Sequence, residues 1–228
     1  IIQHALVEYP GNDANNPAAI VMDSAAPFID QNIVRKSLHD GIWASGTAAP
    51  TIRDNTVQDN QGRGIYVSTS SQALVLNNTV TGSGATGIGA GGGSMIIEGN
   101  TVHGSVGTGI ECGNATARFN RVYANGDTGI IAQTCDVLNN IVAYNGNGGI
   151  HIFYAGNVSG NQVAHNTSPG DRAGISSQYG PIPITYNSVV FNTTESSVAG
   201  VSIYYPNWNG SSGPDCFAYN TVVGQVTP

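Results

Sequence analysis

The sequence predicts an all-β solenoid, a tube of short strands in which each turn of the chain stacks on the one before. Three observations predict it. A motif recurs every 20 to 23 residues over most of the chain, apolar and polar residues alternate within the motif, and the abundant Val, Ile, Asn, Thr and Gly favour strands and turns over helices. A unit this short cannot bury its own apolar side, so stacked neighbours must close the interior.

Each repeat is built around an asparagine that is followed two positions later by a valine. An apolar residue stands three positions before the asparagine, and in most repeats a Gly-Ile or Gly-Val pair begins nine or thirteen positions after it. Side chains two positions apart lie on one face of a strand. The repeat therefore holds three short strands whose apolar faces point into the tube. The asparagines are Asn32, Asn55, Asn78, Asn100, Asn120, Asn140, Asn161, Asn187 and Asn220.

The asparagine and the glycine are predicted at corners between strands. Asparagine tolerates the left-handed backbone conformation that a sharp corner needs, and its amide can bond to the asparagine of the next repeat. We therefore expect an asparagine ladder. Glycine allows the backbone of the next repeat to approach closely at another corner. About nine stacked repeats at ~4.8 Å each predict a rod about 43 Å long.

The composition of the 228 residues excludes several classes of protein. Only 9% of the residues are charged, and the net charge is −7. No apolar run approaches the ~18 residues of a membrane-spanning helix. Seven Lys and Arg residues without a basic cluster argue against nucleic acid as a partner. The chain opens without the basic stretch and apolar core of a signal peptide, which we interpret as a mature or trimmed chain.

The three cysteines form no metal-binding spacing. Cys112 and Cys135 fall on inward columns of neighbouring repeats, but the two columns differ. We therefore expect buried free thiols rather than a disulfide. Cys216 is expected to point outward, where it could form a disulfide with another chain or with a missing segment.

The Asn-x-Val corner, the apolar residue three positions before it and the Gly-Ile pair resemble the repeats of right-handed parallel β-helix proteins of the pectate-lyase-like superfamily. The resemblance covers essentially the whole chain. It implies a polysaccharide partner lying along one sheet face. The composition favours an extracellular or cell-surface location. Another β-solenoid or a repeated β-sandwich hairpin is the alternative. A propeller is excluded, because its blade needs about 40 residues per repeat.

We expect a single domain that spans residues 1–228. Open strand edges at both ends of the tube would pair with other chains. The domain is therefore expected to be a segment of a longer chain, or to be covered at its ends by neighbouring domains or identical chains. Segments 164–173, 190–199 and 205–215 break the regular period. Loops longer than a repeat requires are frequent places for function.

A column of outward positions on the strand after Gly-Ile is the predicted binding surface. Aromatic rings offer flat apolar faces to a sugar, and Arg172 could hold an acidic sugar. The alternative for Tyr154, Tyr179 and Tyr205 is a ladder of rings that stack on each other for stability alone. The predicted substrate-binding residues are Trp43, Tyr66, Phe153, Tyr154, Arg172, Tyr179, Tyr204, Tyr205 and Trp208.

The same column carries the predicted catalytic residues. Glu111 and His151 stand two repeats apart, which places them about 10 Å from each other. Asp127, in the turn before the intervening strand, is expected between them. A carboxylate and an imidazole that face a groove could divide the general acid and base roles of glycan cleavage. The alternative is that all three are solvated surface residues.

Two other groups carry weaker signals. His103 lies one repeat above Tyr123, with Arg121 beside them, and the uronate lyases that the sequence resembles can use a His/Tyr pair with a cation. His39-Asp40 is the second group. No cofactor is expected. Calcium stays open without a clear site, because the acidic residues are scattered.

Motifs of the enzymes in this superfamily are missing from the sequence. It holds neither the paired aspartates, Gly-His-Gly and Arg-x-Lys of polygalacturonase-like enzymes nor the DPHD or DPHE of alginate epimerases. Two functions therefore stay open. The first is a secreted or cell-surface β-helix that binds polysaccharide or serves as a structural or adhesive rod. The second is a polysaccharide lyase or glycoside hydrolase with a groove at Glu111 and His151.

Overall fold

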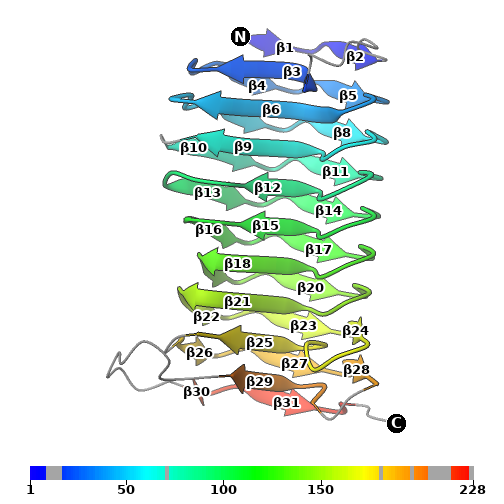
Figure 1. Ribbon diagram of the computed structural model, residues 1–228, viewed down its shortest axis with the longest axis vertical. Coiled ribbons are helices and arrows are strands. Elements are labelled where there is room, and N and C mark those ends of the chain that lie inside the picture. Colours follow the sequence, from blue (N-terminus) through cyan, green and yellow to red (C-terminus); the bar gives the residue numbers. More distant parts are fainter. Residues whose placement is uncertain (9–16, 70–71, 180–181, 196–197, 205–216, 226–228) are drawn as a thin grey trace.

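The computed structural model describes residues 1–8, 17–69, 72–179, 182–195, 198–204 and 217–225. Within these residues every regular element is a strand, and successive turns of the chain stack into a rod (Figure 1). All strand pairs run parallel, so the predicted parallel β-solenoid is confirmed, and about nine rungs is close to the observed number. No helix in the described part of the chain has the length and apolarity to cross a membrane.

Each turn of the chain adds one strand to each of three sheets. The first sheet consists of β1 (Ile2–Gln3), β4 (Phe28–Asp30), β7 (Thr51–Arg53), β10 (Ala73–Leu76), β13 (Met95–Glu98), β16 (Ala115–Arg118), β19 (Asp136–Leu138), β22 (Val158–Ser159), β26 (Ile184–Thr185) and β30 (Phe217–Ala218). The second sheet consists of β2 (Leu6–Glu8), β5 (Ile33–Arg35), β8 (Thr56–Gln58), β11 (Thr79–Thr81), β14 (Thr101–His103), β17 (Arg121–Tyr123), β20 (Ile141–Ala143), β23 (Gln162–Ala164), β27 (Ser188–Val190) and β31 (Thr221–Val223).

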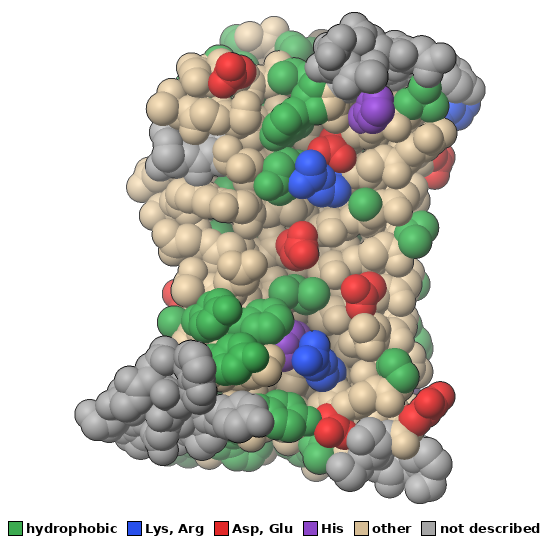
Figure 2. Space-filling view, in the orientation of Figure 1, with side chains coloured by type: hydrophobic (Ala, Val, Ile, Leu, Met, Phe, Trp, Pro, Cys, Tyr) green, Lys and Arg blue, Asp and Glu red, His purple; other side chains and the backbone are tan. Residues whose placement is uncertain are grey.

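The third sheet faces the viewer in Figure 1 and Figure 2. It consists of β3 (Ala18–Asp23), β6 (Asp40–Gly46), β9 (Ile65–Thr69), β12 (Ile88–Ala90), β15 (Ile110–Cys112), β18 (Ile130–Thr134), β21 (Ile150–Ala155), β25 (Ile175–Gln178) and β29 (Val201–Tyr204). A short extra pair, β24 (Thr167–Ser168) with β28 (Thr193–Thr194), exists only in the lower rungs, where the chain has its longer loops.

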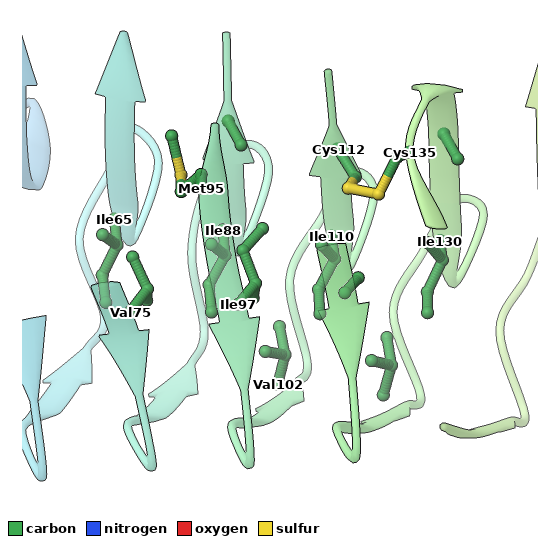
Figure 3. Close-up of a cluster of buried hydrophobic side chains, with 14 of the residues drawn as sticks. Ile65, Val75, Ile88, Met95, Ile97, Val102, Ile110, Cys112, Ile130 and Cys135 are labelled. Atoms are coloured by element: carbon green, nitrogen blue, oxygen red, sulfur yellow. A yellow bond between two sulfur atoms is a disulfide. The ribbon is translucent and has the colours of Figure 1, made fainter. Parts of the chain in front are cut away.

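The interior is a stack of apolar columns, because inward positions of successive rungs are in register. Val57 pairs with Val80 and Val80 with Val102, and all three side chains are fully buried. Ile88 and Ile110 repeat the arrangement on the third sheet (Figure 3). Each fully buried side chain of this size is worth about 1.5–3 kcal/mol, so these columns are the main source of stability.

The predicted asparagine ladder is confirmed from Asn32 to Asn220. In each step the backbone N–H and the side-chain Nδ2 of one asparagine donate to Oδ1 of the asparagine in the next rung. Asn78, for example, donates to Asn100 Oδ1 over 2.8 and 3.0 Å. The other seven steps have the same geometry. The ladder therefore satisfies polar groups that are buried at the corner.

The backbone conformation predicted for the ladder asparagines is wrong. The left-handed residue is the one before each asparagine, as in Asp54, Asn77 and Phe119 with φ of 54°, 54° and 56°. The turn occurs one position earlier, which leaves the asparagine extended with its N–H and amide aimed at the next rung.

A second ladder, which the sequence pattern did not predict, stands five positions after the first. Asn125 donates to Asn145 Oδ1, and Asn145 to Asn166 Oδ1, over 2.9–3.1 Å. Asn192 continues the ladder and ends on Gln225 Oε1. Its signal is weaker because several rungs carry serine at this position, such as Ser105, whose N–H donates to Asn125.

The glycine before Ile fills the predicted role of close approach. A Cβ on Gly41 would lie 2.7 Å from both the carbonyl oxygen of Gly64 and Cγ1 of Val57. A Cβ atom essentially never comes this close to another heavy atom, so any larger residue would force the neighbouring rung to shift.

The prediction of free thiols at Cys112 and Cys135 is wrong, because the two form a disulfide (Figure 3). Cys112 ends β15 and Cys135 directly precedes β19 in the next rung. The two columns differ, but they meet at one corner of the tube, where the Cα atoms are 5.9 Å apart. That separation suits a disulfide. The bond joins residues 23 positions apart and ties two successive rungs together.

Candidate functional site

The outward positions of the third sheet form one column along the rod, with the register that the sequence predicts. Two hollows open along this face. We call them the upper hollow, around Arg63 and Tyr66, and the lower hollow, around Arg172 and Tyr204. From top to bottom the column consists of Trp43, Tyr66, Gly89, Glu111, Ile131, His151, Ser176 and Ser202.

The upper hollow has a volume of about 210 Å³ and contains Glu111. The Arg63 guanidinium carbon lies 3.3 Å from the centre of the Tyr66 ring. Its Nη2 also forms a 2.8 Å ion pair with Asp40, which sits one rung above. Trp43 is tilted against Tyr66 with the ring centres 6.5 Å apart. The only cation at the upper hollow among the described residues is therefore already paired with a carboxylate. The residues that line the upper hollow are Arg63, Tyr66, Ala90, Gly91, Glu111, Cys112, Gly113, Ile131 and Gln133.

The lower hollow has a volume of about 450 Å³ and lies where the 164–173 loop passes beside β25 and β29. The loop is held in place by hydrogen bonds to β29. Tyr204 Oη donates to Asp171 Oδ2, and Ser202 Oγ to the Asp171 carbonyl oxygen, both over 2.8 Å. Burial and then Asp171 raise the pKa of Tyr204, so the phenol stays protonated. The lining consists of Asn147, Ser168, Pro169, Gly170, Asp171, Arg172, Gln178 and Tyr204.

His151 is not the exposed surface residue that the column position predicts, since only 2% of it is exposed. Its Nδ1 lies 2.5 Å from Ser176 Oγ in the rung below. The edge of its ring packs on Phe153, with centres 4.3 Å apart and planes at 78°. Nε2 is buried and has no hydrogen-bond partner in the described part of the chain. A buried polar atom without a partner is costly unless something else satisfies it.

The electrostatics of His151 follow from this position. Burial, and secondly the positive charge of Arg172, lower the pKa of His151 to about 4, while hydrogen bonding to the backbone of Ser176 opposes the shift. The imidazole is therefore neutral at pH 7. Figure 2 shows a histidine beside a basic side chain in the lower part of this face, with hydrophobic side chains next to them.

Phe153, which packs on His151, forms an aromatic cluster with Tyr154 and Tyr179. Tyr154 stacks on Tyr179 with ring centres 5.7 Å apart, and Phe153 on Tyr179 at 6.4 Å. The predicted ring stacking is present for this pair of tyrosines. About half of Tyr154 is still exposed, so the stack is open to a ligand. Tyr205 and Trp208, two further predicted binding residues, lie outside the described residues.

Comparison with known proteins identifies the family. The sequence profile of the right-handed β-helix region matches residues 12–102 and 40–212. The chain belongs to the right-handed β-helix family.

Two solved structures are similar to this β-helix, the periplasmic alginate epimerase AlgG and a point mutant of it. Their TM-scores are 0.56 and 0.57, with 17% and 18% sequence identity. The match covers 82% of this chain but 46% of each epimerase chain, so the β-helix corresponds to less than half of that enzyme's length. At this identity the similarity concerns the fold. No curated protein sequence resembles the chain closely enough to count as a match.

The predicted catalytic residues of the β-helix lie on three successive rungs and do not share one hollow. Glu111 is exposed in the upper hollow, and its Oε2 is 3.5 Å from Thr86 Oγ1. Ile131 separates it from His151 in the register. Asp127 is held by Asn147, whose Nδ2 donates to Oδ1 over 2.8 Å. His151 and Asp127 both lie near the larger, lower hollow without lining it, His151 through Arg172 and Asp127 through Asn147.

The weaker candidates lie elsewhere or are already paired. His103 stacks on Tyr123 with ring centres 4.7 Å apart, on the second sheet, and Arg121 lies over the same tyrosine. Asp40 is nearly buried and serves as the partner of Arg63. Among the described residues, no three His, Cys, Asp or Glu side chains are grouped closely enough to hold a metal ion.

Sequence reasoning missed Asp171, Ser176 and Asn147, which bond to or line the lower site. Asp171 carries the clearest missed signal, because it is an acid next to Arg172 in a loop that breaks the repeat. Ser176 is a polar residue in an outward column, and this does not distinguish it from an ordinary surface serine.

Proposed function

We propose that this β-helix binds a polysaccharide along the face of the third sheet, with the lower hollow as the main contact. The observation that carries this proposal is the 450 Å³ hollow on the same face as the aromatic cluster of Phe153, Tyr154 and Tyr179, to which its lining residue Gln178 connects directly along the chain. A sugar ring needs a flat apolar surface together with a few fixed polar groups. Here the rings of the cluster supply the flat surface, and Arg172, Gln178 and Tyr204 supply polar groups in the lining of the hollow.

Two further observations support this proposal. The structural neighbours are described as an alginate epimerase, and alginate is a polysaccharide. The buried Cys112–Cys135 disulfide fits an oxidising compartment, since such bonds rarely persist in the cytosol. We therefore also propose that the chain is exported, to the periplasm, the cell surface or the medium.

A second candidate function is cleavage of the bound glycan by a lyase or glycoside hydrolase. The neutral imidazole of His151, with no partner for Nε2 among the described residues, favours it, because a general base needs such a nitrogen. Glu111 and Asp127 would then act one or two rungs away. The separation of Glu111 from the lower hollow weighs against this candidate.

The test is a panel of neutral and acidic oligosaccharides, assayed by calorimetry for binding and by chromatography for product release. We expect binding without release. Tyr154→Ala should weaken it about tenfold, because an aromatic contact is lost. Tyr144→Ala is the matched control: this tyrosine is also exposed and also stacked, but on His165 at a corner of the rod.

The alternatives predict other results. Product release that is lost in His151→Ala and Glu111→Gln would establish the enzyme instead. If no oligosaccharide binds, or if Tyr144→Ala weakens binding as much as Tyr154→Ala, the third-sheet face is not a glycan site.

A further inference from the structure

Arg172 differs from the other arginines in its charge partners. Four of the six form ion pairs with carboxylates on neighbouring rungs, and Arg121 lies over the ring of Tyr123. No carboxylate in the described part of the chain forms an ion pair with Arg172, although it lines the lower hollow. The four paired arginines are Arg35, Arg53, Arg63 and Arg118.

His151 is the second unsatisfied group at this place. It is almost fully buried, its Nδ1 is engaged by Ser176, and its Nε2 has no partner among the described residues. Arg172 is close enough for its charge to act on the ring. Within the described residues, a guanidinium without a carboxylate partner therefore lies near a buried imidazole whose Nε2 has no partner. One oxyanion could satisfy both groups.

The net charge around the hollow decides which ligand fits. The charged residues of its lining are Arg172 and Asp171, whose charges cancel while His151 is neutral, and Asp127 lies just outside the lining, where its carboxylate is bonded to Asn147. Asp171 Oδ2 already accepts the hydroxyl of Tyr204. A single negative charge brought here would be left in excess. If Nε2 of His151 takes a proton from solvent, the site gains one positive charge and a donor, and a monoanion then balances it.

We propose that Arg172 and His151 form an oxyanion subsite that takes up one proton as it binds a carboxylate or sulfate group of a glycan. This inference rests on the proposed glycan-binding function and gives the class of its ligand. The oxyanion accepts hydrogen bonds from the guanidinium and from the protonated Nε2, while Ser176 keeps the ring oriented through Nδ1. Binding is therefore tighter in mild acid than at neutral pH.

Few titratable groups face His151, so the proton taken up on binding can be assigned to its imidazole. The rung above offers Ile131 in register, with Asp127 in its leading turn. The rung below offers Ser176, with Asp171 and Arg172 in its leading loop. Tyr204, which is bonded to Asp171, stays protonated over the relevant range. His151 is therefore the group that titrates between about pH 4 and pH 7 when an anion arrives.

The experiment is calorimetric titration of the full chain at pH 6 in two buffers with different ionisation enthalpies. The probes are oligosaccharides of equal length that carry carboxylates, sulfates or no charge. We expect the charged probes to bind at least about tenfold more tightly than the neutral one, with uptake of about one proton. Comparing the carboxylated with the sulfated probe identifies which oxyanion the site takes.

Three variants make the test specific. Arg172→Gln should reduce the preference for charged probes at least about tenfold. Arg118→Gln, which removes a paired arginine from the first sheet, should leave it unchanged. Asp171→Asn should bind the charged probes more tightly at pH 7 and with less proton uptake, because the hollow is then positive without His151 protonation. A misfolded protein could not produce that gain.

The outcomes separate this inference from the proposed function. If the neutral probe binds as tightly as the charged ones and Arg172→Gln changes nothing, the oxyanion subsite is wrong, while glycan binding stands. If charged probes bind without proton uptake, or with uptake that persists in His151→Gln, the role of His151 is wrong. If no probe binds, both proposals fall together.

Discussion

The upper and lower hollows are two versions of one arrangement on the same sheet face, and they differ in what their arginine contacts. In both, an arginine and a carboxylate stand beside aromatic rings. Arg63 is bound to Asp40 and lies flat on Tyr66, so its charge is used within the fold. Arg172 has no such ion pair among the described residues and faces a hollow twice the volume. The difference teaches that the residue stacked beside an arginine in a repeat protein decides whether its charge is paired within the fold or remains available to a ligand.

The register explains why. Asp40 and Arg63 each precede the Gly-Ile glycine of their rung, so regular stacking places them one above the other. Arg172 belongs to a rung whose loop is four residues longer, and the neighbouring turn offers Asn147 instead of an acid. The turn beside Arg172 thus carries an amide where the turn beside Arg63 carries the acid Asp40. Variants at the upper and lower hollows can test this contrast in arginine pairing.

Loss of the disulfide should have the largest effect, and it should affect the upper end. Cys112 lines the upper hollow and its bond to Cys135 closes a segment of 23 residues. The double variant Cys112→Ala with Cys135→Ala should lower the free energy of unfolding by about 3 kcal/mol. Urea unfolding measures it, and wild-type protein with reductant should show the same loss. A loss of glycan binding in the still-folded variant would contradict the separation of the two hollows.

Acid should destabilise the lower end. The folded state lowers the pKa of His151 to about 4 from its ordinary value of 6.5, so the unfolded chain binds the proton more readily. The free energy of unfolding should therefore fall by up to about 3 kcal/mol as the pH drops from 6.5 to 4. Urea unfolding at several pH values measures the slope. His151→Gln should flatten it, and an unchanged slope in that variant would exclude His151 as the cause.

Asp40→Asn should make the upper hollow resemble the lower one. The variant removes a nearly buried carboxylate that accepts from the backbone N–H and the side chain of Arg63. We expect a loss of about 2 kcal/mol in stability. In an Arg172→Gln background the same change should restore weak binding of charged oligosaccharides, measured by calorimetry. Asp54→Asn, at an exposed acid 3.9 Å from Arg53, is the control. No gain would show that charge pairing does not distinguish the hollows.

The smallest effect concerns the corners, which also differ between the two ends. The left-handed position before the ladder asparagine holds Asp54 and Asn77 in upper rungs but Tyr186 and Tyr219 in lower ones. The tyrosine rings stack with centres 4.9 Å apart. Tyr186→Ala loses the stacking and keeps the backbone strain, so we expect a loss of about 1 kcal/mol. Tyr186→Gly also relieves the strain and should cost less. Urea unfolding measures the free energy of unfolding of both variants. A larger loss for Tyr186→Gly than for Tyr186→Ala would contradict the idea that backbone strain at this position matters.

Sequence predicted the repeat far better than its exceptions. The three strands per rung, the first asparagine ladder and the inward valines all follow from spacing that recurs in every repeat. The outward column was predicted in register for the same reason. The second ladder escaped notice because serine replaces asparagine in several rungs, which hides the period. The disulfide escaped because column position along a strand does not reveal which columns meet at a corner.

The sequence by itself determined the tube, because alternation at two positions and repetition at about twenty leave one way to bury every apolar face. Only the tertiary structure decided the site. His151 has the spacing of a surface residue and is nonetheless buried, with Phe153 packed on its ring, Ser176 at Nδ1 and the charge of Arg172 from the 164–173 loop acting on it. The place of Arg172 depends on the path of an irregular loop, and a loop follows no period that a sequence could display.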